Sequence, residues 1–418
     1  MNKSTTGLFS AYEDIWLLDG LRTAFADYNG VLGLVSPIDL GIKAARSLFA
    51  KTKIAPGDVN SIIAGSVAQA SFDAYMLPRH IGLYSGVPYD RPAHLVQRVC
   101  GTGIEAISQA ADAIALKKIQ LALCVGAESM SRNPIVAFTH RGGFRMGQVE
   151  FKDFLWEALL DTCPNVTMGG TAENLAKQYK VTRDDADRFA ELSFSRAVAA
   201  QKDCFLSGEI TPVLTEQFEL PGYKPRGIRL PKGTERFDSD THIRPSSLEA
   251  LAKIPPAFGG VQTGGNSSAI VDGAAAALVA SGSYANSQNL EPLARIAAIA
   301  TVGVPPEIMG ISPANAIRAL LDGVSLPLDA INRFEINEAF AAQYMAVERE
   351  LELDRSKVNV NGGAIAIGHP LAATGLRLAL TLARELVRSK LRWGVASACI
   401  GGGQGIALLI ENQRAKAH

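Results

Sequence analysis

Short apolar runs alternate with longer stretches of helical periodicity in the first and the last third of the chain. This alternation is typical of α/β proteins, and several runs are apolar on both faces, as in the central strands of a sheet that helices cover. Six of the runs are predicted to be strands: residues 15–18, 61–64, 121–125, 331–336, 394–398 and 406–410.

Two segments repeat the order of a glycine-containing turn, a helix and a strand. In the first, a turn at residues 100–103 precedes an alanine-rich helix that extends to about residue 118, and a strand follows. In the second, residues 368–375 precede a helix that extends to about residue 390, again followed by a strand and a turn. This weak repeat predicts an α/β fold in which duplicated halves form a layered core.

The middle of the chain differs from both halves because it contains many charged residues and proline-punctuated turns. One clear helix is predicted there, starting at Thr182, which forms a capping-box-like pair with Asp185. Long loops in compact proteins are usually functional, so we expect an inserted loop or lid domain. The predicted N-terminal half is residues 1–287, including this insertion at about 132–260, and the C-terminal half is residues 288–418.

The composition is that of a globular protein, with 47% hydrophobic and 20% charged residues, which excludes disorder of most of the chain. The 41 basic side chains balance 41 acidic ones, so no general attraction to nucleic acid or anionic membranes is expected. No apolar run is long enough to span a bilayer, and the first residues do not resemble a secretory signal. We expect a soluble, cytoplasmic protein.

The five cysteines are an odd number and show no CxxC pair or zinc-ligand spacing, so neither a disulfide scaffold nor a metal site is predicted. Cys100 is the unusual one, because it directly precedes two glycines and an amphipathic helix. A helix N-terminus favours the thiolate through its dipole and its unpaired N–H groups. Cys100 is therefore a candidate nucleophile, and the alternative is a buried thiol that packs against the turn.

His369 lies between Gly368 and Pro370 at the start of the second repeated helix. Backbone in a glycine-rich turn can approach a ligand closely, and the imidazole can reach another loop. His369 is a candidate general base, and the alternative is an ordinary hydrogen-bonded surface histidine.

Cys399 ends an apolar strand and is followed by three glycines that start at Gly401. Consecutive glycines can point backbone N–H groups inward, which suits a developing oxyanion. The alternative is a tight turn with a buried cysteine, while the spacing does not match a phosphate-binding loop. Asn337, in the sequence NEAF, can orient a water or hold a carbonyl, and its alternative role is that of a helix cap.

Together, the segments RVCGTG, NEAF, GGAIAIGHPLAATG and CIGGGQG resemble the thiolase family and occur in that family's order. Weaker similarity starts at LLDGLRTAF and extends to the C-terminal strand, so the resemblance covers essentially the whole chain. It implies a two-step acyl transfer through an acyl-cysteine, which cleaves 3-ketoacyl-CoA with CoA or condenses acetyl-CoA with an acyl-CoA.

Carried over residue by residue, the resemblance implies that Cys100 is the nucleophile and His369 the base that activates it. Cys399 would be the acid and base for the α-carbon of acetyl-CoA. Asn337 would hold a water beside His369 in one oxyanion hole, and the N–H groups of Cys100 and Gly401 would form the second.

The resemblance also implies that Ser268, Met168 and Phe340 line the tunnel for the pantetheine arm of coenzyme A. The chain departs from the common family pattern at four positions, which leaves the acyl-chain preference open. These are Ala269 and Ala372 in place of glycine, Val271 in place of asparagine, and Thr167 where some biosynthetic members have histidine.

Three alternatives compete with a thiolase. A decarboxylating condensing enzyme of the ketosynthase type shares the duplicated fold, but it has histidine where Asn337 stands and lacks a counterpart of Cys399. A non-catalytic acyl-CoA-binding subunit is expected to have lost Cys100, His369 or Cys399, and all three are present. A nucleotide-binding protein needs a lysine or a ribose-binding acid that the glycine-rich turns here do not have.

The resemblance implies acyl-CoA and CoA as substrates, no tightly bound cofactor, and a homodimer or homotetramer. We expect an apolar sheet edge of the N-terminal half to form the dimer contact. The phosphates of coenzyme A are expected to meet basic residues of the middle region, namely Lys224, Arg226, Arg229, Lys232, Arg236 and Arg244.

Overall fold

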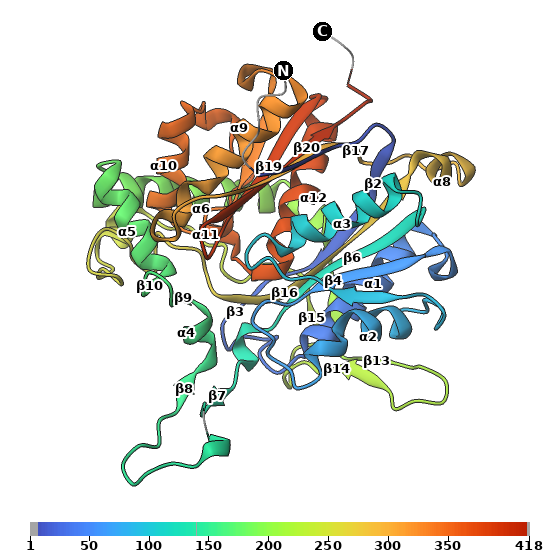
Figure 1. The fold of residues 1–418 in the computed structure, drawn as a ribbon, viewed down its shortest axis with the longest axis horizontal. Coiled ribbons are helices and arrows are strands. Elements are labelled where there is room, and N and C mark those ends of the chain that lie inside the picture. The colour runs from blue at the N-terminus through green and yellow to red at the C-terminus, as the bar shows by residue number, and fades with distance from the viewer. Residues whose placement is uncertain (1–6, 139, 416–418) are drawn as a thin grey trace.

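The computed structural model describes residues 7–138 and 140–415. Its centre is a 12-stranded mixed sheet (Figure 1). The main path of the sheet runs in the order β18 (Arg333–Ile336), β19 (Trp393–Ile400), β20 (Gln404–Glu411), β17 (Ala294–Gly303), β2 (Ile15–Thr23), β16 (Val271–Ser281), β6 (Leu121–Glu128), β4 (Ser61–Gly65) and β5 (Ala93–Leu95). Three short strands join it beside this path: β1 (Leu8–Ala11), β3 (Ala26–Asp27) and β11 (Ile210–Thr211).

The two ends of this sheet have the same connectivity. β4 is parallel to β6, and β16 lies antiparallel between β6 and β2. In the other half β18 is parallel to β19, and β20 lies antiparallel between β19 and β17. The halves meet where β2 pairs with β17. This confirms the predicted fold class, whereas the boundary at residues 287/288, between α8 (Gly282–Ser287) and β17, remains a prediction.

Helices form three layers around the two halves of the sheet. α12 (Leu371–Ser389) contacts β6 and β16 of one half and β18 and β19 of the other, and α3 (Thr102–Ala115) packs beside it. α1 (Pro37–Thr52) and α9 (Ser312–Val324) cover the outer faces. The alternation along β16 shows this, because Ala274 and Ala276 belong to the apolar cluster of α1 while Ala275 and Ala277 belong to that of α3 and α12.

The two central helices touch through their backbones. A Cβ on Gly103 would lie 2.5 Å from the backbone nitrogen of Leu376, and one on Gly375 would lie 2.4 Å from that of Ile104. Only glycine allows such an approach. Since the candidate nucleophile and base directly precede these helices, the contact brings the two residues to one place.

Local sequence accounts for most element starts. α6 (Arg183–Lys202) follows Thr182, and the side chains of Thr182 and Asp185 make both hydrogen bonds of the predicted capping box. A cap of this kind contributes about 1 kcal/mol. The predicted strand at residues 331–336 is shorter in the structure, because a 3₁₀ turn ends at Ala330 and β18 begins only at Arg333.

Residues 132–260 contribute short elements whose buried side chains join the main clusters. Phe189 and Phe194 of α6 belong to the central cluster, and Phe218 and Phe237 belong to the cluster of α1. The segment that carries β7, β8 and α4 projects away from the body (Figure 1). The short elements of this region are β7 (Ile135–Val136), β8 (Lys152–Asp153), α4 (Phe154–Ala158), β9 (Leu160–Asp161), β10 (Val166–Thr167), α5 (Met168–Gln178), β12 (Val213–Leu214), β13 (Glu216–Phe218), β14 (Arg226–Ile228), β15 (Arg236–Phe237) and α7 (Leu248–Ala252).

Three further helices complete the fold: α2 (Leu77–Tyr84), α10 (Ala341–Leu351) and α11 (Ala364–Ile367). A search of the described residues for membrane-spanning helices finds none with the necessary length and apolar character.

Candidate active site

Cys100 lies between β5 and α3 with 8% of its surface exposed. Val99 before it has a φ of +42°, which is rare for a β-branched residue and marks a constrained turn. Burial raises the pKa of the Cys100 thiol to about 12, opposed by hydrogen bonds from the N–H groups of Gly401 and of Cys100 itself. Burial thus outweighs the helix-terminus effect expected from the sequence, and the thiol stays protonated until a base removes its proton.

His369 is 6% exposed and is held on both ring nitrogens. The hydroxyl of Thr374 donates to the carbonyl of Pro370, so it accepts from Nδ1 of His369, 2.6 Å away. This arrangement leaves Nε2 as an acceptor, with Nδ2 of Asn337 at 3.3 Å. Burial, together with the charge of Arg377, lowers the pKa of His369 to about 3, so the imidazole is neutral and able to accept a proton.

Asn337 follows β18 directly and is fully buried. Its backbone N–H donates to the carbonyl of Ser397 on β19, which fixes the turn. Its Oδ1 is buried without a hydrogen-bond partner among the described residues. Buried polar atoms are normally paired, so this amide is placed to engage a further group near His369.

Cys399 is fully buried at the end of β19, against Met309 and Ala339 and beneath Met168 and Phe340. Burial raises the pKa of its thiol, and the neighbouring Cys100 raises it further. The structure therefore brings the two cysteines together, and both are protonated at neutral pH.

The glycine turn after Cys399 points its first N–H group at the nucleophile. Gly402 and Gly403 have φ values of +85° and +81°, which glycine adopts without strain. With that backbone, the N–H of Gly401 reaches Cys100. The two predicted oxyanion donors, the N–H groups of Cys100 and Gly401, thus lie at the same sulfur.

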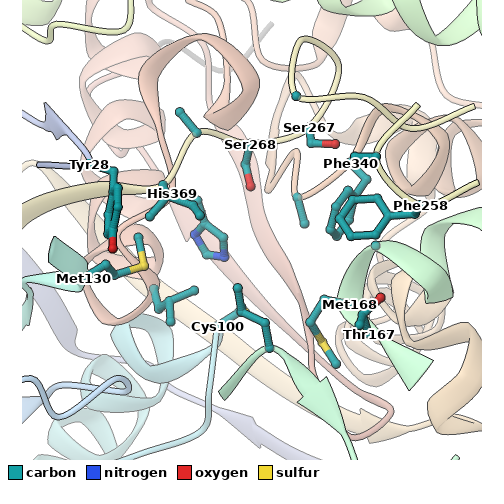
Figure 2. Close-up of a pocket in the computed structure, with 18 of the residues that line it drawn as sticks. Tyr28, Cys100, Met130, Thr167, Met168, Phe258, Ser267, Ser268, Phe340 and His369 are labelled. Atoms are coloured by element: carbon teal, nitrogen blue, oxygen red, sulfur yellow. The ribbon is translucent and has the colours of Figure 1, made fainter. Parts of the chain in front are cut away.

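A cavity of about 450 Å³ opens over this centre, and both Cys100 and His369 lie on its wall. Figure 2 shows Met168 and Phe340 on one side of Cys100 and Ser268 above it. The ring of Phe258 packs edge-on against Phe340, with ring centres 6.1 Å apart. All three residues expected to line the pantetheine tunnel therefore line this cavity.

Asn337 and Cys399 lie behind the residues that line the cavity. Asn337 contacts the lining residue His369, and Cys399 contacts the lining residues Met168 and Phe340. A second cavity of about 240 Å³ shares Cys100 and Met168 with the first, and its wall includes Gly401. Cys100 thus borders two cavities, so one cavity could hold a group bound to its sulfur while a second molecule enters the other.

Several site residues are not marked by the sequence pattern. Thr374 lies five positions after His369, and its hydroxyl bonds the imidazole ring. A hydroxyl residue at this spacing is the sequence feature that could have indicated it. The aromatic and apolar wall residues come from many separated segments of the chain, so no local motif indicates them. They include Tyr28, Met130, Trp156 and Phe258.

Two of the four departures from the family pattern have local explanations. Thr167 caps α5 by accepting from the N–H of Gly170 at 3.2 Å. Val271 packs where Gly368 leaves space, since a Cβ on that glycine would lie 2.6 Å from it. The structure does not explain alanine in place of glycine at Ala269 or Ala372, although the backbone carbonyl of Ala269 accepts from the N–H of His369 at 3.0 Å.

The six basic residues expected to meet phosphates have different surroundings in the structure. The carbonyl of Lys224 accepts from the hydroxyl of Tyr84 at 2.6 Å. Arg226 forms ion pairs with Asp39 and Asp73, and Arg236 pairs with Asp238. Arg229 and Lys232 border a separate cavity of about 670 Å³. Arg244 is next to the main cavity, because it hydrogen-bonds His242, which lies on the cavity wall.

Comparison with known proteins agrees with this geometry. A profile described as "Thiolase, N-terminal domain" matches residues 15–283, and one described as "Thiolase, C-terminal domain" matches residues 290–412. The chain is 40% identical to mitochondrial 3-ketoacyl-CoA thiolase of Homo sapiens over 95% of this chain and 98% of that protein. It is 40% identical to acetyl-CoA acetyltransferase of Pseudomonas aeruginosa over 95% of this chain and 99% of that protein.

Solved structures show the same similarity. The human mitochondrial 3-ketoacyl-CoA thiolase in complex with CoA superimposes with a TM-score of 0.90 at 39% identity, over 96% of this chain and 98% of that one. The Bacillus anthracis acetyl-CoA acetyltransferase gives 0.88 at 37% identity, over 96% of this chain and 99% of that one. On sequence, fold and family profile alike, this chain belongs to the thiolase family of acyltransferases.

Proposed function

We propose that this thiolase cleaves 3-ketoacyl-CoA with CoA, and condenses acetyl-CoA with an acyl-CoA in reverse, through an acyl group on Cys100. The observation that carries the proposal is the meeting of Cys100, His369 and the N–H of Gly401 at one cavity. Relatives named for both activities are equally similar, so similarity to them does not choose a physiological direction.

In the cleavage direction, Nε2 of His369 takes the proton of Cys100, and the thiolate attacks the 3-keto carbon. The N–H groups of Cys100 and Gly401 stabilise the oxyanion of the adduct. The bond between carbons 2 and 3 then breaks, its electron pair goes to carbon 2, and Cys399 protonates that carbon. Asn337 and His369 hold the thioester oxygen of the departing acetyl-CoA, through a water on Asn337.

The second half-reaction transfers the acyl group to CoA. The thiolate of Cys399 takes the proton of the CoA thiol, whose sulfur attacks the acyl carbon on Cys100. The leaving thiolate of Cys100 regains its proton from His369, so both cysteines and the histidine return to their starting states. A covalent intermediate allows each half-reaction to use its own oxyanion site.

Coenzyme A is proposed to enter along Ser268, Met168 and Phe340 in the cavity of about 450 Å³ over Cys100. A thiolysis assay with CoA and 3-ketoacyl-CoA substrates of increasing chain length tests the proposal directly. We expect release of acetyl-CoA from at least one of these substrates. No thiolysis at any chain length, together with no condensation of acetyl-CoA, would contradict it.

Self-association into a homodimer or homotetramer is the second part of the proposal. β5 lies at the end of the sheet in the N-terminal half, and an open strand edge favours pairing with another copy. The projecting segment also exposes large apolar side chains, including Ile135 and Phe151. Sedimentation at micromolar concentration is expected to give more than the 44.3 kDa of one chain, and a single monomeric species would contradict self-association.

A cytoplasmic location also remains a proposal, because several similar thiolases are mitochondrial. Fractionation of cells that express the full chain, followed by detection in cytosolic and organelle fractions, tests it. Enrichment in an organelle fraction would overturn it.

A further inference from the structure

Glu128 is a buried acid that the proposed chemistry does not use. It ends β6 and has no exposed surface. Its carboxylate accepts hydrogen bonds from the hydroxyl of Ser66 at 2.9 Å and from the N–H groups of Val67 and Ala68 at 3.1 Å. It also accepts from the N–H of Ala372 at 3.0 Å. One side chain thus joins the loop after β4 to the first turn of α12.

The start of α12 needs an external partner. Its N-cap residue is Pro370, which provides no side-chain hydrogen bond to the first turn. The first N–H groups of a helix have no partner within the helix. A carboxylate is the group best suited to that place, because it also interacts favourably with the positive end of the helix dipole. Glu128 therefore caps α12 from a different strand.

This cap lies next to the candidate base. Ala372 is three residues after His369, and Thr374, which orients the imidazole, lies in the same turn. On its other side, Glu128 holds Ala68, which packs in one small apolar cluster with Cys100 and Leu371. The carboxylate thus fixes the backbone that follows His369 and a residue that packs against Cys100.

The backbones of β6 and of the first turn of α12 also approach each other closely beside Glu128. A Cβ on Gly126, two residues before Glu128 on β6, would lie 2.1 Å from the carbonyl of Ala372. Burial raises the pKa of Glu128, and the N–H of Ala372 is the strongest group opposing that rise. The strand and the helix start are therefore held together by direct approach and by this hydrogen bond.

From these contacts we infer that Glu128 is a positioning residue that fixes the separation between Cys100 and His369 by capping α12 from β6. This inference rests on the proposed roles of those two residues. Glu128 touches no substrate in this arrangement, because the cavity of about 450 Å³ over Cys100 is lined by other side chains. It acts on the reaction through the geometry of the helix start, and its charge also helps to raise the pKa of the Cys100 thiol. Misplacement by about 1 Å can reduce a rate about 100-fold, whereas loss of the charge alone is expected to ease deprotonation of Cys100.

The test compares Glu128→Gln with Asp272→Asn. Asp272 is a matched control, because it is a buried acid on the neighbouring strand β16 and accepts from the N–H and hydroxyl of Ser131. In Glu128→Gln, an NH₂ group faces N–H donors. We expect kcat of thiolysis and the rate of Cys100 acylation to fall about 10- to 100-fold, with the KM for CoA within about twofold. We expect Asp272→Asn to keep kcat within about threefold of the wild-type value, even if its melting temperature falls as much as that of Glu128→Gln.

Two results would overturn the inference: wild-type kcat in Glu128→Gln, or equal losses of kcat in both variants in proportion to stability. If Glu128→Gln does not fold, Ser66→Ala is the second variant, because it removes one of the donors that hold the Glu128 carboxylate in place and keeps the carboxylate itself. Hydrogen exchange of the first turn of α12 should then rise together with a fall in kcat, and unchanged exchange and kcat would refute the role of the cap. If wild-type Cys100 is not acylated at all, the proposed chemistry is refuted instead, whatever Glu128→Gln does to hydrogen exchange in α12.

Discussion

The starts of α3 and α12 occupy equivalent positions in the two halves of the sheet, yet one carries a thiol and the other an imidazole. Burial acts on them in opposite directions, since it raises the pKa of Cys100 to about 12 and lowers that of His369 to about 3. Both groups are therefore neutral in the free site. A duplicated scaffold thus supplies two similar turns, and the side chain at each decides which of them gives the proton and which takes it.

The largest expected effect is the loss of the nucleophile. Cys100→Ser should abolish covalent acylation, because a serine hydroxyl has a far higher pKa than a thiol and His369 is a weak base here. Intact-protein mass spectrometry after incubation with acetyl-CoA should show an acyl adduct on wild type only. Cys124→Ser is the control, since Cys124 is also a buried free cysteine, lies on β6 and does not line the cavity, so its replacement should leave the adduct unchanged. An adduct on Cys100→Ser would disprove the assignment.

Removing the base tests the other half of the comparison. His369→Gln should lower kcat about 10²- to 10⁴-fold, the usual contribution of general base catalysis. His94→Gln, on an exposed histidine that bonds Gln109, should keep wild-type kcat.

In wild type, alkylation of Cys100 by iodoacetamide should keep accelerating up to at least about pH 10, because the thiolate fraction rises towards a pKa near 12. A plateau of the alkylation rate below pH 8 would contradict the raised pKa.

Cys399 separates acylation from carbon chemistry. Cys399→Ala should still acylate at Cys100 but lose exchange of the acetyl-CoA α-proton with solvent deuterium by about 100-fold or more. Mass spectrometry of recovered acetyl-CoA measures the exchange, and the adduct on the protein confirms that the variant is folded. Wild-type exchange in this variant would remove Cys399 from the acid and base role.

A smaller effect is expected from replacing Thr374, which orients His369 but does not take part in the proton transfer. Thr374→Val removes the hydroxyl that accepts from Nδ1, and a lost hydrogen bond of about 1–1.5 kcal/mol corresponds to about a tenfold lower kcat. Thr381→Val is matched to it, because Thr381 is a buried threonine of the same helix that bonds Glu209 instead. Equal kcat in the two variants would mean that the hydrogen bond to His369 does not orient the base.

The smallest effect concerns the charged end of coenzyme A. Arg244→Gln should raise the KM for CoA severalfold and flatten its salt dependence, with kcat nearly unchanged, since one phosphate contact is lost. Arg229→Gln is the comparison, because Arg229 borders the separate cavity. If Arg229→Gln rather than Arg244→Gln raises the KM, the phosphates bind on the other side of the molecule.

The sequence predicts those parts of the fold that local chemistry decides. The helix starts at Thr182 and beside Cys100 and His369 follow from caps and glycine turns, and the six predicted strands overlap strands of the central sheet. β16 is not marked by the pattern, because its alanine run has neither polar alternation nor β-branched residues. It is a strand because helices pack closely on both of its faces, and only the tertiary structure provides that constraint.

The candidate site shows the same division. Cys100, His369, Asn337 and Cys399 stand in recognisable turns, so their resemblance to a family identifies them. Phe258 and Trp156 line the cavity only because distant segments meet there, and one sequence without the fold does not indicate such contacts. The opposite pKa shifts also depend on burial, which the helix-terminus reasoning from sequence underestimates at Cys100.

The crossing of α3 and α12 at Gly103 and Gly375 has a consequence for how this chain can change over generations. In an ordinary packing contact, a larger side chain on one helix can be matched by a smaller one on its partner. Here both partners are already glycine, so no second substitution can make room for a first. The outer helices α1 and α9 have close glycine contacts with the side chains of Ile81 and Phe9, which a second substitution could shorten, whereas this one crossing must be inherited unchanged in both halves at once.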